Sequence, residues 1–147
     1  MQFNSFEILF FPSFRFKNGA APLPKFFIAL KKVKNKLIVA SLPTSQDHVP
    51  DNIKVEGCIE YPDKCISCFC FFKQKTICDD TGFKFHKDTF IYASAVDTYN
   101  LGTLKSYYPI KDIDYFVKGK LSKKLETELY QCLKNSFDLK RGIKKIL

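Results

Sequence analysis

The 147-residue chain lacks the features of several common protein classes. It has no stretch that approaches the apolar length of a membrane span, so no membrane partner is expected by way of a spanning segment. It has no internal repeat and no low-complexity tract, which argues against a solenoid or a disordered chain. Tryptophan is missing altogether. The length fits one domain spanning residues 1–147 and leaves little room for a second.

A secretory signal is also missing from the sequence. Residues 1–6 have neither the basic start nor the continuous apolar run of a signal peptide. Proteins that stay in a reducing compartment seldom form disulfides. The sequence therefore predicts a cytoplasmic protein whose six cysteines are reduced thiols.

Phenylalanine and positive charge are abundant. The chain has 16 Phe residues and a formal net charge of +9. Aromatic and β-branched residues favour pleated sheet over helix. A strongly basic protein favours an acidic partner, which includes RNA, DNA, an anionic membrane surface or an acidic protein. Net charge does not choose among these partners.

Short apolar runs separated by turn residues predict a sheet-rich fold. Residues 24–30 and 36–42 are expected to pair as a hairpin around a turn at Lys34 and Asn35. Residues 43–52 are polar and predict an exposed loop. The other expected strands are residues 7–11, 53–59, 67–75, 89–96 and 104–110, with an extended segment at 13–16 and a strand-like connector at 111–116.

One C-terminal helix is the clearest single element. Leu121 and Ser122 provide an apolar staple residue and an N-cap, and apolar residues then recur at helical spacing through Leu133. The basic tail, residues 140–147, is expected to fray. Six or seven short strands with one helix predict a mainly β fold, in the form of a small curled barrel closed by a C-terminal α-helix.

Three stretches in order resemble the PemK/MazF family of toxins from type II toxin–antitoxin systems. The first is an acidic-apolar strand that runs into a Pro-Ser-Phe turn and a glycine loop at residues 7–19, followed by Leu23 and Pro24. The second is an apolar strand that ends in a Thr-Ser pair, at residues 38–45. The third is residues 116–122, where a Gly-Lys-Leu-Ser sequence enters the last helix. The resemblance implies an SH3-like barrel of the PemK/MazF/CcdB type, usually a homodimer. It also implies a metal-independent endoribonuclease that needs no cofactor, cleaves single-stranded RNA and binds an acidic antitoxin protein.

The resemblance also implies a catalytic pair, of which this chain keeps one half. The family's threonine after the third strand matches Thr44, with Ser45 beside it. The family's arginine before the second strand falls on Leu23, which supplies neither a cation nor a donor. Lys25 or His48 could then serve as catalytic groups, but a lysine cannot make the bidentate contact of an arginine, so cleavage is expected to be weakened.

Cations and aromatic rings near the loops are the candidate RNA contacts. We expect phosphate contacts from Arg15, Lys17, Lys25 and Lys105, and base stacking on Tyr107, with Tyr99 and Tyr108 as further stacking candidates.

Two alternatives remain open. The first is a binding module on the same barrel that contacts RNA or a protein without cutting. The second is a zinc-stapled domain, suggested by the Cys65-x-x-Cys68 spacing together with Cys58, Cys70 and Cys78. Against zinc, Cys68 and Cys70 alternate with phenylalanines in an apolar strand, and Cys132 reads as a helix core residue.

Overall fold

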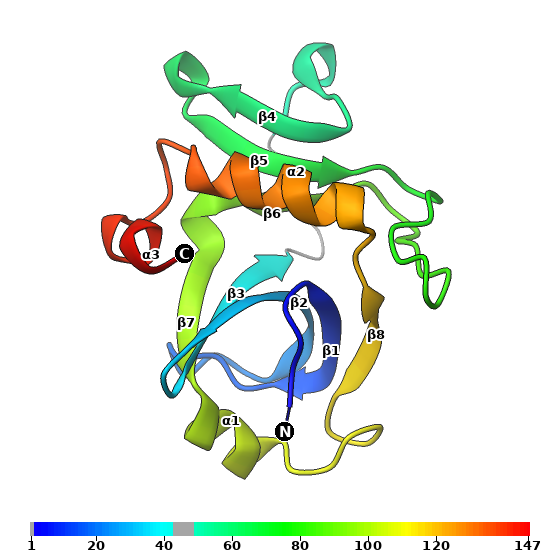
Figure 1. Ribbon diagram of the computed structural model, residues 1–147, viewed down its shortest axis with the longest axis vertical. Helices are drawn as coiled ribbons and strands as arrows, with labels where there is room; N and C mark the ends of the chain where they lie inside the picture. Colours follow the sequence, from blue (N-terminus) through cyan, green and yellow to red (C-terminus); the bar gives the residue numbers. More distant parts are fainter. Residues whose placement is uncertain (1, 43–48) are drawn as a thin grey trace.

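The computed structural model describes residues 2–42 and 49–147 of the chain (Figure 1). Its strands are β1 (Glu7–Phe14), β2 (Leu23–Val33), β3 (Lys36–Leu42), β4 (Gly57–Tyr61), β5 (Ile66–Phe71), β6 (Thr89–Tyr92), β7 (Val96–Asn100) and β8 (Phe116–Lys120). Its α-helices are α1 (Leu101–Tyr107), α2 (Lys123–Lys134) and α3 (Arg141–Ile146), and short 3-10 turns lie at Asp51–Ile53, Pro62–Lys64 and Ala93–Ala95.

Five strands form the larger sheet in the order β7-β3-β2-β1-β8, and every pair of neighbours is antiparallel. The hairpin of β2 and β3 closes at Lys34, whose φ of 55° is left-handed. The predicted hairpin and its turn are therefore confirmed. β1 runs on through Pro12 to Phe14, because a bulge between Phe11 and Phe14 accommodates the proline.

Period-two alternation divides the side chains of this sheet between its two faces. Ile8, opposite Ile28, belongs to a cluster of buried residues shared with α2 and β5. Leu9, opposite Phe27, belongs to a separate cluster shared with α1. The sheet is thus covered on both faces, with α1 on one side and α2 on the other (Figure 1).

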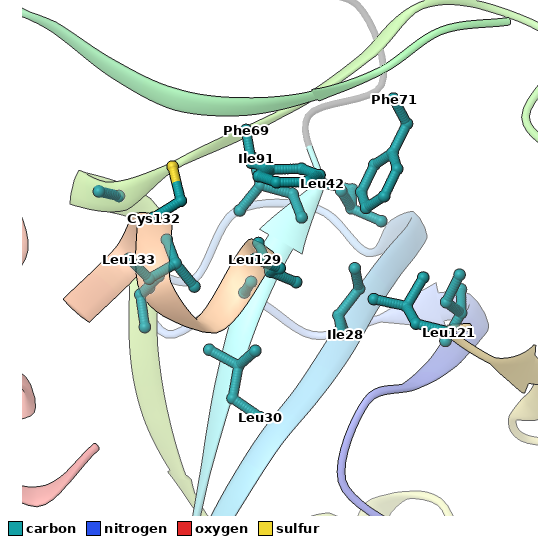
Figure 2. Close-up of a cluster of buried hydrophobic side chains, with 14 of the residues drawn as sticks. Ile28, Leu30, Leu42, Phe69, Phe71, Ile91, Leu121, Leu129, Cys132 and Leu133 are labelled. Atoms are coloured by element: carbon teal, nitrogen blue, oxygen red, sulfur yellow. The ribbon is translucent and has the colours of Figure 1, made fainter. Parts of the chain in front are cut away.

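The largest cluster lies where α2 packs between the two sheets. Figure 2 shows Leu129 of α2 between Leu133 of the same helix and Ile28 of β2, with Phe69 and Ile91 from the smaller sheet above it. All five side chains are at most 1% exposed. The helix begins where the sequence predicted, because the Ser122 hydroxyl accepts a hydrogen bond from the Leu125 amide at 3.3 Å.

Three strands form the smaller sheet in the order β4-β5-β6. Its strand β5 places Cys68 and Cys70 on one face, in a cluster with Phe90, as the predicted alternation requires. The prediction of reduced thiols is wrong for Cys58 and Cys132, because a disulfide joins β4 to α2 through these two residues. The two cysteines are 74 residues apart, so nothing local in the sequence predicted that they meet.

The basic C-terminal tail does not fray. Residues 141–146 form α3, and the Ile143 and Leu147 side chains are 6% and 5% exposed in the largest cluster. The Tyr130 hydroxyl of α2 donates a hydrogen bond to the Leu147 carbonyl at 3.0 Å. The lysines of the tail stay at the surface, while its spaced apolar residues pack onto the core.

The strand predicted at residues 104–110 is also wrong. Residues 104–107 belong to α1, and residues 108–110 follow the helix without strand structure. The N-cap of α1 is Asn100, whose side-chain oxygen accepts a hydrogen bond from the Thr103 amide at 3.0 Å. Leu101 and Leu104, three residues apart, are each 5% exposed beneath this helix. An N-cap followed by apolar residues at helical spacing was thus present in the sequence.

The mainly β class is confirmed, with antiparallel sheets and a few helices. Each sheet has two free ends in its strand order, so neither sheet is closed within residues 2–42 and 49–147. No helix in the described part of the chain is long and apolar enough to cross a membrane.

Candidate aromatic pocket

An open pocket of about 600 Å³ lies beside α1, on the face of the larger sheet away from α2. We call it the aromatic pocket. Three segments line it: residues 14–22 at the β1–β2 connection, Tyr99 and Asn100 at the end of β7, and α1 with the residue that follows it. Phe16 and Tyr107 supply exposed apolar surface, the buried Phe14 and Leu104 lie beneath it, and Arg15 and Lys17 supply positive charge.

Each of the two cations lies over an aromatic ring of the pocket. The Arg15 guanidinium carbon is 4.6 Å from the centroid of the Tyr107 ring. The Lys17 ammonium is 4.3 Å from the centroid of the Tyr99 ring. Cation–π pairs at this distance are attractive, and they hold both charges at the pocket instead of leaving them free in solvent.

Asp97 fixes the Lys17 side chain further. The Lys17 ammonium donates to Asp97 Oδ2 at 3.0 Å and to the Thr98 carbonyl oxygen at 2.5 Å. Lys140 lies 3.9 Å from the other carboxylate oxygen of Asp97. The Lys17 side chain is still 53% exposed, so a ligand can approach it from solvent.

Tyr108 ties the two walls of the pocket together. Its hydroxyl accepts a hydrogen bond from the Arg15 backbone amide at 2.8 Å. Its ring stacks on Phe14 with an interplanar angle of 10°, and its side chain packs into the buried cluster with Phe11. These contacts make the start of the β1–β2 connection rigid relative to α1.

Burial raises the pKa of the Tyr99 hydroxyl further above neutral pH. Desolvation, with smaller contributions from the charge of Asp97 and from Tyr108, raises the pKa of Tyr99 to about 12. At neutral pH this hydroxyl is therefore a hydrogen-bond donor and is not a base. The groups that line the pocket are equipped to bind an anion with a planar group, and the neighbouring Asp97 carboxylate is engaged by Lys17 and Lys140.

The three predicted catalytic residues Thr44, Ser45 and His48 lie outside the described residues. The fourth, Lys25, stands on β2 opposite Phe11. It is half-buried, and desolvation lowers the pKa of its amine. Leu23, at the family's arginine position, is 58% exposed opposite Phe14.

The structure brings together three of the predicted RNA contacts, Arg15, Lys17 and Tyr107, and also Tyr99. Lys105 lies elsewhere: it lines a separate hollow of about 320 Å³ with Lys32 and Phe3. Tyr108 as a stacking platform is a wrong prediction, because its side chain is only 5% exposed.

Sequence reasoning missed Asp97, Asn100 and Thr103 as parts of this region. Asp97 is 80 residues from Lys17, and no spacing or motif connects them. Asn100 and Thr103 had a readable signal, since they form the helix cap that the strand prediction overlooked.

The zinc alternative finds no ligand set in the described part of the chain. Cys58 and Cys132 are joined to each other, while Cys68 and Cys70 are buried in the smaller sheet. No group of three or more His, Cys, Asp or Glu side chains within the described ranges is placed to hold a metal ion.

Comparisons of the chain with protein-family models, with curated proteins and with solved structures gave no match.

Proposed function

We propose that this chain binds single-stranded RNA and that the aromatic pocket is the docking site. The observation that carries the proposal is the pair of cations held over Tyr107 and Tyr99 at the mouth of one open pocket. Proteins that bind single strands combine positive charge that follows the backbone with rings on which bases stack. The formal net charge of +9 adds a long-range attraction for a polyanion.

The test measures the affinity of purified protein for a fluorescent, unstructured RNA by anisotropy. Substituting Arg15→Ala together with Tyr107→Ala is expected to weaken binding at least about 5-fold, since stacking contributes about 1–3 kcal/mol per base. Lys105→Ala is the matched control, because it removes one charge from α1 outside the pocket. Equal losses in the double variant and the control would contradict the proposal.

Salt dependence gives a second readout. Each phosphate contact on a single strand contributes about 0.7 to the slope of log affinity against log salt. Lys17→Ala is expected to reduce the slope by about that amount. An unchanged slope would remove Lys17 from the interface.

Cleavage of the bound RNA is a second candidate function, and the observation that favours it is Lys25. A half-buried amine with a lowered pKa exchanges a proton nearer neutral pH than an exposed lysine does.

This candidate is the metal-independent toxin endoribonuclease, with Thr44, Ser45 and His48 as its further catalytic groups. A homodimer, an acidic antitoxin partner and a cytoplasmic site of action belong to the same proposal. The Cys58–Cys132 disulfide weighs against the cytoplasmic site of action, because disulfides in cytosolic proteins are usually transient.

The same proposal includes an SH3-like arrangement of the two sheets. β6 continues through the turn at Ala93–Ala95 directly into β7, and β3 contacts β6. This chain connection and this contact support the view that the two sheets are the curled halves of one barrel.

Incubation with mixed single-stranded RNA in the absence of metal tests the second candidate. Slow cleavage that disappears in Thr44→Ala and falls in Lys25→Ala would support it. Intact RNA with a clear gel shift would leave binding as the function.

A further inference from the structure

We propose that the aromatic pocket takes a single nucleotide unit, with the base against the Arg15–Tyr107 pair and the phosphate on the Lys17 ammonium. This inference rests on the proposed function and names the part of the RNA that the pocket receives. A free nucleoside monophosphate carries the same chemistry, so the experiment must distinguish the two sources.

The dimensions of the pocket suit one nucleotide. Its volume of about 600 Å³ falls in the range of small-molecule sites, about 300–1,000 Å³. Apolar surface from Phe16 and Tyr107 lies beside the polar groups of Asn100 and Thr103. A planar heterocycle that carries hydrogen-bonding groups at its edge matches this lining.

Lys17 is prepared to hold a phosphate. An ammonium has three N–H donors. Two hydrogen bonds, to Asp97 Oδ2 and the Thr98 carbonyl, hold the ammonium over the Tyr99 ring. A phosphate would take the remaining N–H in place of its contact with the ring. Because the side chain is already ordered over Tyr99, binding does not have to fix its rotamers.

The Arg15–Tyr107 pair provides the stacking surface. The Tyr107 side chain is 48% exposed, and the guanidinium over it is planar. Unpaired bases stack both on aromatic rings and on arginine planes. The Arg15 backbone amide is bound to the Tyr108 hydroxyl, so the pair keeps its position relative to the floor of the pocket.

Both cation–ring pairs belong to one pocket. Arg15 and Lys17 are two residues apart on the same connection, and Tyr99 and Tyr107 lie before and at the end of α1. The two cation–ring pairs thus stand on one pocket and not on separate surfaces. One pair is assigned to the base and the other to the phosphate of the same nucleotide.

The test follows NMR signals of the tyrosine rings during titration with uridine, with UMP and with a four-nucleotide RNA. UMP is expected to bind at least 5-fold more tightly than uridine in the wild type. In Lys17→Ala this preference should disappear, and in Tyr107→Ala both ligands should weaken at least 5-fold. Lys105→Ala and Tyr61→Ala are the matched controls, since they remove one charge and one exposed ring outside the pocket.

The outcomes separate this inference from the proposed function. UMP that binds no better than uridine, or equal effects of Tyr61→Ala and Tyr107→Ala, overturn the single-nucleotide site. RNA binding that persists without UMP binding overturns it too, while the proposed function stands. If the protein binds neither UMP nor RNA, the single-nucleotide site and the proposed function are both overturned. A tetranucleotide that binds more tightly than UMP and displaces it identifies RNA as the source, and equal affinities identify a free nucleotide.

Discussion

At the scale of single residues, Asp97 decides how Lys17 is held at the pocket. Burial by itself raises the pKa of the Asp97 carboxyl, but the Lys17 hydrogen bond, the Thr98 amide and the charges of Lys17 and Lys140 more than offset it, so the pKa lies below its usual value. A carboxyl with a depressed pKa stabilises the fold above its unfolded pKa. The Asp97–Lys17 contact is therefore complete at neutral pH and is lost as the pH falls below about 4.

Asp97→Asn is expected to weaken RNA binding although it makes the protein more positive. Without the carboxylate the Lys17 side chain is no longer held over Tyr99, and ordering it again costs about 1 kcal/mol, or roughly 5-fold in affinity. Asp51→Asn is the matched control, because it removes the same charge from a fully exposed side chain. Anisotropy with the fluorescent RNA measures both. Tighter binding by Asp97→Asn than by the control would show that only net charge matters.

At the scale of elements, Gly119 shows why β8 can lie against the loop that covers it. Its φ is +144°, and a Cβ there would stand 2.4 Å from Thr81 Oγ1 and 2.8 Å from Cys78 Cβ. The Thr81 hydroxyl donates to the Lys118 carbonyl, and Asp80 accepts from the Lys120 amide. The glycine of the Gly-Lys-Leu-Ser sequence is thus required by the approach of this loop to the outer strand.

Gly119→Ala is expected to lower the free energy of unfolding by about 1–3 kcal/mol, because the new methyl group forces the loop or the strand to shift. Urea unfolding of the variant and the wild type measures the difference. Gly142→Ala is the control: it lies in α3 with nothing within 4 Å, and alanine there favours the helix. Equal urea midpoints for the two variants would mean that the loop at Cys78 and Thr81 shifts to accept the methyl group without destabilising the protein.

At the scale of the whole molecule, the disulfide joins parts that are far apart in the chain. Cys58 is on the outer strand of the smaller sheet, and Cys132 is near the end of α2. Cys58 is exposed, so a reductant can reach the bond. The closed loop of 74 residues restricts the unfolded chain and thereby stabilises the folded state.

Reduction is expected to lower the free energy of unfolding by about 2–4 kcal/mol. Thermal unfolding with and without dithiothreitol measures the change. Cys58→Ser should melt at the lower temperature in both conditions and show no response to the reductant. If the melting temperature of the wild type also does not change with dithiothreitol, the disulfide does not stabilise the folded protein.

Local patterns predicted the parts of the fold that depend on neighbouring residues. The β2–β3 hairpin with its turn at Lys34 and the capped start of α2 were both readable, because backbone geometry and capping act within a few residues. The segment at residues 104–110 was misread, since β-forming tyrosines there outweighed the Asn100 cap. The tail was misread because its lysines hide the spacing of Ile143 and Leu147.

For the candidate site, the sequence supplied the residue types and tertiary structure supplied the partners. Arg15, Lys17 and Tyr107 could be named in advance, because cations and rings are what RNA contacts need. That they meet at one pocket, while Lys105 does not, depends on how β7 and α1 pack beside the β1–β2 connection. Contacts such as Lys17 with Asp97 and Cys58 with Cys132 span 80 and 74 residues. Composition and local spacing determined the strands, the turns and the positive charge; only the packing of the sheets and helices decided which side chains became neighbours, because such pairs are set by the geometry of the whole core.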